Sequence, residues 1–257
     1  MERFSIDRER FARALQDAEE RQSEDGGIGT LREKLLHATL KNYFSGEGDL
    51  PEQKIGRYVA DLYGPEGVTE IQTGSTAPLR KKIGTLLQSA PVTVVCPVMR
   101  KKELFWIDPA TAEVTPGRKS PKKGAFSDLL PEMLYLSEWI GREDFTVVVF
   151  LYDGQEYRLK NGWSKDGKKG AERYERRPTE PVDLLVLKSL YDCGALLPEN
   201  CPPTFTAAEF SKRTRFRGRK NWAALKFLTE AGILSRDDTV RPQTYEVVYK
   251  EFLTKKG

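Results

Sequence analysis

Two acidic side chains interrupt a pair of apolar runs in the stretch RYVADLYGPEGVTEIQT, residues 57–73. Asp61 ends the first run, and Glu70 lies inside the second. Because side chains alternate along a strand, Glu70 and Gln72 share one face while Ile71 turns into the core. Carboxylates that converge at a sheet edge repel each other unless a cation neutralises them. Oxygen ligands of this kind suit Mg²⁺ or Mn²⁺, so the stretch predicts a metal site formed by Asp61, Glu70 and the main-chain carbonyl of Ile71.

Each of these acids also has a purely structural interpretation. Asp61 can simply end a strand before a turn, and Glu70 with Gln72 can lie on an exposed strand face. A single metal site would explain both acids together.

A third acid and the single histidine lie in the upstream segment TLREKLLHATLKNYF, residues 30–44, which predicts a helix. Glu33 follows Thr30 at capping-box spacing, which is a structural role. Glu33 could also reach the metal site as a water-mediated ligand or a base. His37 lies one helical turn later on the same face and could carry a proton or contact phosphate. A packing or surface role for His37 is the alternative.

Helices and short strands alternate along residues 1–160, which indicates an α/β domain with a mixed sheet flanked by helices. Turn residues and apolar periodicity set the expected elements. Helices are expected at 6–22, 30–44, 75–89 and 125–140, strands at 52–63, 67–73 and 91–98, and hairpins turning at Asp108-Pro109 and Asp153-Gly154.

The C-terminal residues 182–257 predict a separate, smaller domain, after a basic linker or loop at 161–181. Trp222, Leu225 and Leu228 recur at three-residue intervals and are expected in its core. The expected elements are helices at 181–194, 205–216 and 217–232, followed by strand-like residues. Two short helices joined by an Arg-Gly-Arg turn and followed by strands resemble a winged helix-turn-helix.

Basic side chains in this domain point to a polyanion as partner. Residues 211–227 hold seven Lys or Arg and no acid. Phosphates favour a helix N-terminus, and Arg and Asn can also read base edges. The candidate DNA-binding residues are Arg217, Arg219, Lys220 and Asn221. A winged helix used for protein contact is the alternative.

Composition excludes several other classes of protein. Charged residues make up 31% of the 257 residues and hydrophobic residues 39%, which is too apolar for a disordered chain. The longest apolar run, FTVVVFLY, is strand-sized, so no membrane span is expected. The charged N-terminus lacks a signal core, which favours a cytoplasmic location. The three scattered cysteines are expected to be free thiols, and no GxSxG or Walker-type sequence is present.

The order of the acids resembles the PD-(D/E)XK nuclease superfamily over about residues 28–98. The matching residues are Glu33 on a helix, Asp61 on a strand, and Glu70-Ile71-Gln72 on the next strand. Ala60 stands at the family's proline, and Gln72 at its lysine. The resemblance implies a restriction-endonuclease-like fold and Mg²⁺-dependent (or Mn²⁺-dependent) hydrolysis of DNA phosphodiesters by a metal-activated water.

The missing lysine leaves the source of the positive charge open. The candidates that could replace it are Lys54, Arg57, Lys81 and Lys82. The resulting hypothesis is a DNA endonuclease-like protein with Glu33, Asp61, Glu70 and Gln72 at its catalytic site. A catalytically inactive nucleic-acid-binding protein on the same scaffold is the alternative, a protein-interaction module is a third possibility, and a homodimer is an open arrangement.

Overall fold

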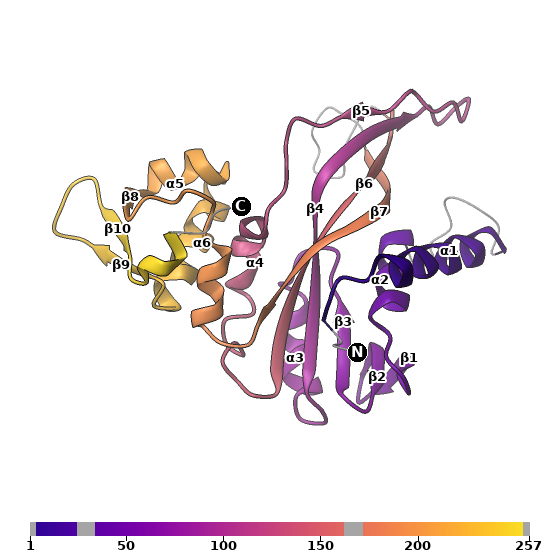
Figure 1. Ribbon diagram of the computed structural model, residues 1–257, viewed down its shortest axis with the longest axis horizontal. Helices are drawn as coiled ribbons and strands as arrows, with labels where there is room; N and C mark the ends of the chain where they lie inside the picture. The colour runs from indigo at the N-terminus through magenta and orange to yellow at the C-terminus, as the bar shows by residue number, and fades with distance from the viewer. Residues whose placement is uncertain (1–3, 25–33, 162–171, 254–257) are drawn as a thin grey trace. The chain divides into compact units, whose positions relative to one another are not determined.

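A computed structural model describes residues 4–24, 34–161 and 172–253, and these residues form an α/β fold. Seven strands make one mixed sheet in the order β1-β2-β3-β4-β6-β7, with β5 paired to β4, and helices flank it (Figure 1). The strands of this sheet are β1 (Leu50–Ile55), β2 (Tyr58–Gly64), β3 (Gly67–Ile71), β4 (Val92–Ile107), β5 (Arg118–Lys119), β6 (Phe145–Leu159) and β7 (Glu172–Leu187). The sequence-based prediction of a mixed sheet flanked by helices is therefore confirmed.

The chain divides by its internal contacts into two compact units, each of which is described by itself. The first unit consists of residues 1–47, 99–124 and 150–184, and the second of residues 48–98, 125–149 and 185–257. Among the residues that the structure describes, no helix combines the length and the apolar composition that crossing a bilayer requires.

Two packed helices, α1 (Arg8–Glu24) and α2 (Leu35–Phe44), cover the aromatic core of the first unit. Phe150 of β6 is fully buried, with its ring centroid 5.5 Å from that of Phe44 and 5.9 Å from that of Phe11. Tyr43 packs against the same ring at 5.6 Å. Aromatic side chains bury a large apolar area. The apolar periodicity of the two helices forms their inner face, and packing of that face on this aromatic cluster holds them in place.

The second unit begins with the antiparallel meander β1-β2-β3. Helix α3 (Leu79–Leu86) then carries the chain to β4, which pairs parallel to β3. Gly67, the first residue of β3, has φ +99°, and a Cβ there would collide with the carbonyl oxygen of Pro91. Glycine is required because only it combines this conformation with so close an approach of β3 to the residue that precedes β4.

Two parts of the sequence-based prediction are wrong in this region. The hairpin expected at Asp153-Gly154 does not form, since β6 continues through both residues to Leu159. The helix expected at 181–194 is instead the end of β7, followed by the 3₁₀ helix η2 (Tyr191–Leu196). The run PVDLLVL is short and rich in apolar residues, and such a run fits a strand as well as a helix until the sheet supplies a partner.

Other expected elements are shifted or shortened. Residues 172–181, expected within a basic linker, belong to β7, and residues 162–171 lie outside the described residues. The helix expected at 125–140 is reduced to the 3₁₀ helix η1 (Phe126–Leu129) and α4 (Leu130–Met133). The hairpin expected at Asp108-Pro109 is confirmed, because Ile107 and Val114 form an antiparallel bridge.

The C-terminal residues of the second unit form two helices and a small antiparallel sheet of order β8-β10-β9. Its elements are β8 (Thr204–Thr206), α5 (Ala207–Thr214), α6 (Arg219–Glu230), β9 (Leu234–Asp237), β10 (Thr244–Val247) and the 3₁₀ helix η3 (Lys250–Leu253). Thr206 and Glu209 form a capping box at the start of α5. Leu225 and Leu228 are buried as predicted, but Trp222 is 54% exposed, so its expected place in the core is wrong.

Candidate functional site

The acidic pair Asp61 and Glu70 meets at neighbouring strands. The antiparallel register that pairs Leu62 with Thr69 sets Asp61 opposite Glu70. Asp61 Oδ2 accepts a hydrogen bond from the backbone N–H of Ile71 at 2.7 Å. The backbone N–H of Asp61 donates to Glu70 Oε1 at 3.4 Å. The convergence of these two acids, expected from strand alternation, is therefore present.

Burial perturbs the titration of Glu70. Glu70 is 2% exposed, and burial together with the nearby charge of Asp61 raises its pKa from 4.5 to about 7. Lys82 of α3 opposes this shift, since its ammonium group donates a hydrogen bond to Glu70 Oε2 at 2.5 Å. A carboxylate pair in a buried setting favours either a proton or a cation, and here one cation comes from the chain itself.

Lys82 therefore supplies the positive charge that the sequence left unassigned. Its side chain is 18% exposed and that of Glu70 is 3% exposed, so the ion pair is largely removed from water. Lys82 was one of several basic candidates on the sequence, and only contact across α3 and β3 distinguishes it. Lys81, the neighbouring residue on α3, is exposed.

Gln72 and the loop after β3 form the rim of this site. Gln72 Nε2 donates to the carbonyl oxygen of Ser75 at 2.5 Å, so its amide holds the loop that leads into α3. The same loop is fixed by Glu132, whose Oε2 accepts from Ser75 Oγ at 2.9 Å and from the Thr76 N–H at 2.9 Å. Sequence reasoning missed Glu132, because it lies 57 residues from Ser75 and no local pattern marks it.

The remaining residues of the expected catalytic site are not brought to the pair. Glu33 lies outside the described residues. His37 is half-buried on α2 and belongs to the contact unit that does not contain Asp61 and Glu70. Within residues 4–24, 34–161 and 172–253, no group of three or more His, Cys, Asp or Glu side chains is placed to hold a metal ion. An ion at this pair would thus depend on two carboxylates and main-chain oxygen, the set expected from the sequence.

The four candidate DNA-binding residues divide into two roles. Arg217 Nη1 donates to the carbonyl oxygen of Ser211 at 2.9 Å, which ties the turn before α6 to α5. Asn221 Nδ2 donates to the carbonyl oxygen of Ala207 at 3.0 Å, which ties α6 itself to α5. Arg219 and Lys220 are exposed in the first turn of α6. Arg217 is exposed as well, but its guanidinium group is engaged by α5, whereas Arg219 and Lys220 lie at the helix start itself.

A groove of 710 Å³ lies beside the exposed face of α6. Trp222, Lys226 and Arg236 are among its lining residues, and the Lys226 ammonium group lies 5.8 Å from the centroid of the Trp222 ring. Sequence spacing had assigned Trp222 to the core, because an i, i+3 pattern does not say which of its members faces outward.

The three cysteines are free and buried, as the sequence predicts. Burial raises the pKa of Cys96 and Cys193 to about 12 and that of Cys201 to about 11. Thiolates are the reactive form of cysteine, so these groups are structural and not nucleophiles.

The raised pKa of Glu70 makes stability depend on pH. Because the folded state holds the proton more tightly than the unfolded chain, stability is expected to fall as pH rises from about 4.5 to about 7. The full shift corresponds to about 3 kcal/mol. Glu70→Gln should remove this dependence, as measured by urea unfolding at pH 5 and pH 8. The exposed Glu66→Gln is the control, and parallel pH profiles for wild type and Glu70→Gln would contradict the assignment.

Comparison with known proteins places the chain in a family. Residues 34–188 match the model described as Domain of unknown function (DUF8091). A protein of Treponema pallidum (strain Nichols), named "Uncharacterized protein", is 30% identical over 163 residues, which cover 63% of this chain and 62% of that protein. The chain thus spans less than two thirds of that relative's length. No solved structure matches. The matched region holds Asp61, Glu70 and Lys82 and exceeds half of the chain, so the chain belongs to the DUF8091 family.

Proposed function

We propose that the protein is a Mg²⁺-dependent or Mn²⁺-dependent phosphodiesterase that cleaves DNA, with Asp61 and Glu70 as its metal ligands. The observation that carries the proposal is that Asp61 lies opposite Glu70 on neighbouring strands, with the ammonium group of Lys82 bound to Glu70. Two acids in contact are costly to ionise together, and a divalent cation stabilises the doubly charged form. The main-chain carbonyl of Ile71 would complete the oxygen set on the protein side.

The order of elements supports a restriction-endonuclease-like core as the finer description of the fold. Helix α2 is followed by the antiparallel meander β1-β2-β3, then by α3 and by β4 parallel to β3. This is the order of helix, acid-bearing strands, helix and buried strand that the PD-(D/E)XK resemblance implies. The acids lie on the second and third strands of the meander, as in that family.

The chain's own residues have separable roles in this proposal. A bound divalent ion would supply Lewis-acid polarisation of a phosphoryl oxygen and an activated water. The register of β2 and β3 places Asp61 opposite Glu70, and each carboxylate accepts a hydrogen bond from the backbone of the other strand. Lys82 favours the ionised form of Glu70 and places positive charge where a phosphate becomes more negative during attack. Gln72 holds the loop at the rim of the site.

The C-terminal elements support DNA as the substrate class. The order η2, β8, α5, α6, β9, β10, with β10 between β8 and β9, matches the helix and strand order of a winged helix-turn-helix. In that arrangement α6 is the recognition helix, with Arg219 and Lys220 at its exposed start. Trp222 and Lys226 add an aromatic and a cationic group on the same helix.

One observation favours the alternative, a catalytically inactive nucleic-acid-binding protein. The Lys82 ammonium group already pairs with Glu70, and a chain-borne cation can replace the charge that a metal ion would otherwise supply. Calorimetric titration with Mg²⁺ and Mn²⁺ separates the two proposals. A nuclease shows carboxylate-dependent binding, whereas the inactive protein shows none.

Removal of either acid should abolish cleavage and spare DNA binding. Asp61→Ala and Glu70→Ala are each expected to lower the rate of Mg²⁺-dependent cleavage by at least about 10²-fold, because both ligands are needed to hold the ion. The assay uses duplex, branched and single-stranded DNAs, and anisotropy measures binding. Glu66→Ala, an exposed acid in the same hairpin, should cleave like wild type. Full activity in both site variants would reject the nuclease assignment.

Lys82, and not Gln72, is expected to fill the role of the family's lysine. Lys82→Ala should slow cleavage by about 10²-fold and move the acid limb of the pH–rate profile to higher pH, because Lys82 lowers the pKa of Glu70. Lys82→Arg should restore part of the rate, and Gln72→Ala should leave the pH profile in place. A profile that shifts with Gln72→Ala but not with Lys82→Ala would reverse the two roles.

Neutralising the start of α6 should weaken DNA binding without affecting the metal site. Arg219→Gln and Lys220→Gln are each expected to weaken the salt dependence of DNA binding. The slope of log K against log salt concentration should fall by the amount that corresponds to about one phosphate contact. Lys250→Gln, an exposed basic residue of η3, is the control. Unchanged slopes in both α6 variants would favour a protein-contact role for the winged helix.

A further inference from the structure

A buried glutamate in the first contact unit lies at the centre of a basic cluster that the nuclease proposal does not use. Glu156 of β6 is 0% exposed. Its Oε2 accepts from Lys102 Nζ at 2.8 Å, and its Oε1 accepts from Arg158 Nε at 2.7 Å. Burial alone would raise the pKa of Glu156, but the hydrogen bonds and charges of Lys102 and Arg158 outweigh it and hold the pKa at about 2. The cations around Glu156 thus favour its ionised form.

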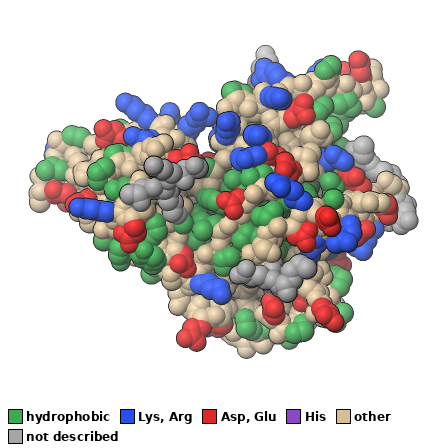
Figure 2. Space-filling view, in the orientation of Figure 1, with side chains coloured by type: hydrophobic (Ala, Val, Ile, Leu, Met, Phe, Trp, Pro, Cys, Tyr) green, Lys and Arg blue, Asp and Glu red, His purple; other side chains and the backbone are tan. Residues whose placement is uncertain are grey.

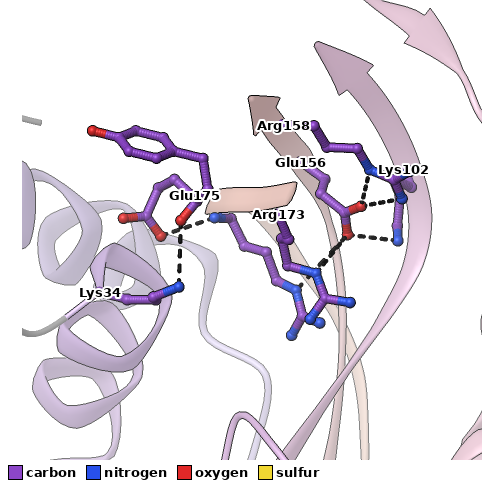
Figure 3. Close-up of polar contacts among 8 residues, drawn as sticks. Lys34, Lys102, Glu156, Arg158, Arg173 and Glu175 are labelled. Carbon is purple, nitrogen blue, oxygen red and sulfur yellow. Dashed lines mark hydrogen bonds and ion pairs between the residues drawn. The ribbon is translucent and has the colours of Figure 1, made fainter. Parts of the chain in front are cut away.

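Two further arginines from β7 approach the same carboxylate. Arg173 Nε lies 3.6 Å and Arg176 Nε 3.9 Å from Glu156 Oε2. Figure 3 shows Lys102 and Arg158 on one side of Glu156 and Arg173 on the other. The four cations, here named the Glu156 cluster, leave three positive charges uncompensated by the central carboxylate.

Glu175, on β7 beside Arg176, does not remove this excess. Glu175 accepts a hydrogen bond from the backbone N–H of Arg176 at 2.8 Å and points away from Glu156, toward the side of Lys34 (Figure 3). Lys34 in turn donates to the carbonyl oxygen of Tyr174 at 3.3 Å. Glu175 and Lys34 thus contribute opposite charges beside the cluster, and its balance stays positive.

Repulsion among the basic groups lowers the pKa of two of them. Burial lowers the pKa of Lys102, and the charges of Arg176 and Arg158 lower it further, against the pull of Glu156. Burial and the charge of Arg176 likewise lower the pKa of Arg173. One or two cations would suffice to neutralise a buried carboxylate, and each additional like charge costs stability. A structural ion pair alone does not account for four of them.

The cluster is open to solvent on the side of its cations. The Arg173 side chain is 53% exposed and that of Arg158 is 35% exposed. An adjoining groove of 380 Å³ is lined by Lys101, Lys102, Lys119 and Lys123, with Glu103 and Asp153 as its acids. Asp153 is already paired with Arg100 at 2.6 Å. Lys and Arg side chains gather on the visible face where Figure 1 draws β4 and β5 (Figure 2).

We propose that the Glu156 cluster binds a phosphate group of a nucleic-acid backbone. Planar guanidinium groups match phosphate oxygens in geometry and charge, and Glu156 fixes the inner cations so that the outer ones face the ligand. The shared chemistry is phosphate, and the choice of a nucleic-acid strand rests on the proposed function. The lysines along the groove continue the positive surface as a backbone would require.

The test uses the full chain in EDTA, so that binding is measured without cleavage. Arg173→Gln removes the most exposed cation while Lys102 and Arg158 still neutralise Glu156. It is expected to weaken binding of labelled single-stranded and duplex DNA about fivefold at low salt and to reduce the salt slope by about one contact. Arg13→Gln, the same charge change on the exposed face of α1, should leave both unchanged. Equal unfolding midpoints confirm that both variants fold.

A second arm titrates inorganic phosphate and separates the sources of the anion. If Arg173→Gln lowers phosphate affinity but leaves the DNA salt slope unchanged, the nucleic-acid assignment is overturned. If neither ligand responds, the cluster is structural and the proposal fails. The measurement does not depend on the metal site. In an Asp61→Ala background, adding Arg173→Gln should weaken DNA binding by the same factor as in the wild type. If Arg173→Gln weakens DNA binding but the wild-type protein cuts no DNA, only the proposed nuclease function is contradicted.

Discussion

The second unit has to hold Asp61 and Glu70 next to each other although their carboxylates repel, and its packing has to meet this constraint. The register of β2 and β3 sets the two acids opposite each other, and Glu70 is buried, so water screens its carboxylate poorly. Lys82 of α3 offsets part of the repulsion. Two contacts fix the elements that carry these three groups. β3 approaches Pro91 closely at Gly67, and Glu132 accepts a hydrogen bond from the loop before α3. The fold thus holds an electrostatically unfavourable pair in place by packing.

The same residue type behaves in opposite ways at two buried positions. Glu70 has one cationic partner and a neighbouring acid, and its pKa rises to about 7. Glu156 is surrounded by cations, and its pKa falls to about 2. Burial raises the pKa of both, so the number and sign of the neighbouring charges decide the outcome. An acid with a raised pKa favours a proton or a metal ion, whereas an over-neutralised acid leaves a surface that favours an anion.

Local patterns predicted much of the fold but failed where a tertiary partner decides. The periodicity of α1 and the acid-bearing hairpin of β2 and β3 each depend on neighbours a few residues away. The run 181–187 suits a helix or a strand and becomes a strand because the sheet offers it a partner. Trp222 fits the apolar spacing of α6 yet lies on its exposed face.

The sequence by itself determined that Asp61 and Glu70 would share one face of adjacent strands, because strand alternation and a tight turn fix that relation locally. Only the tertiary structure decided which basic residue pairs with the acids, since Lys82 reaches Glu70 from a helix whose position depends on the sheet. The Glu156 cluster depends still more on the fold, because Lys102 and Glu156 are 54 residues apart. Charges so distant along the chain meet only when strand pairing brings them together, and no local pattern encodes that pairing.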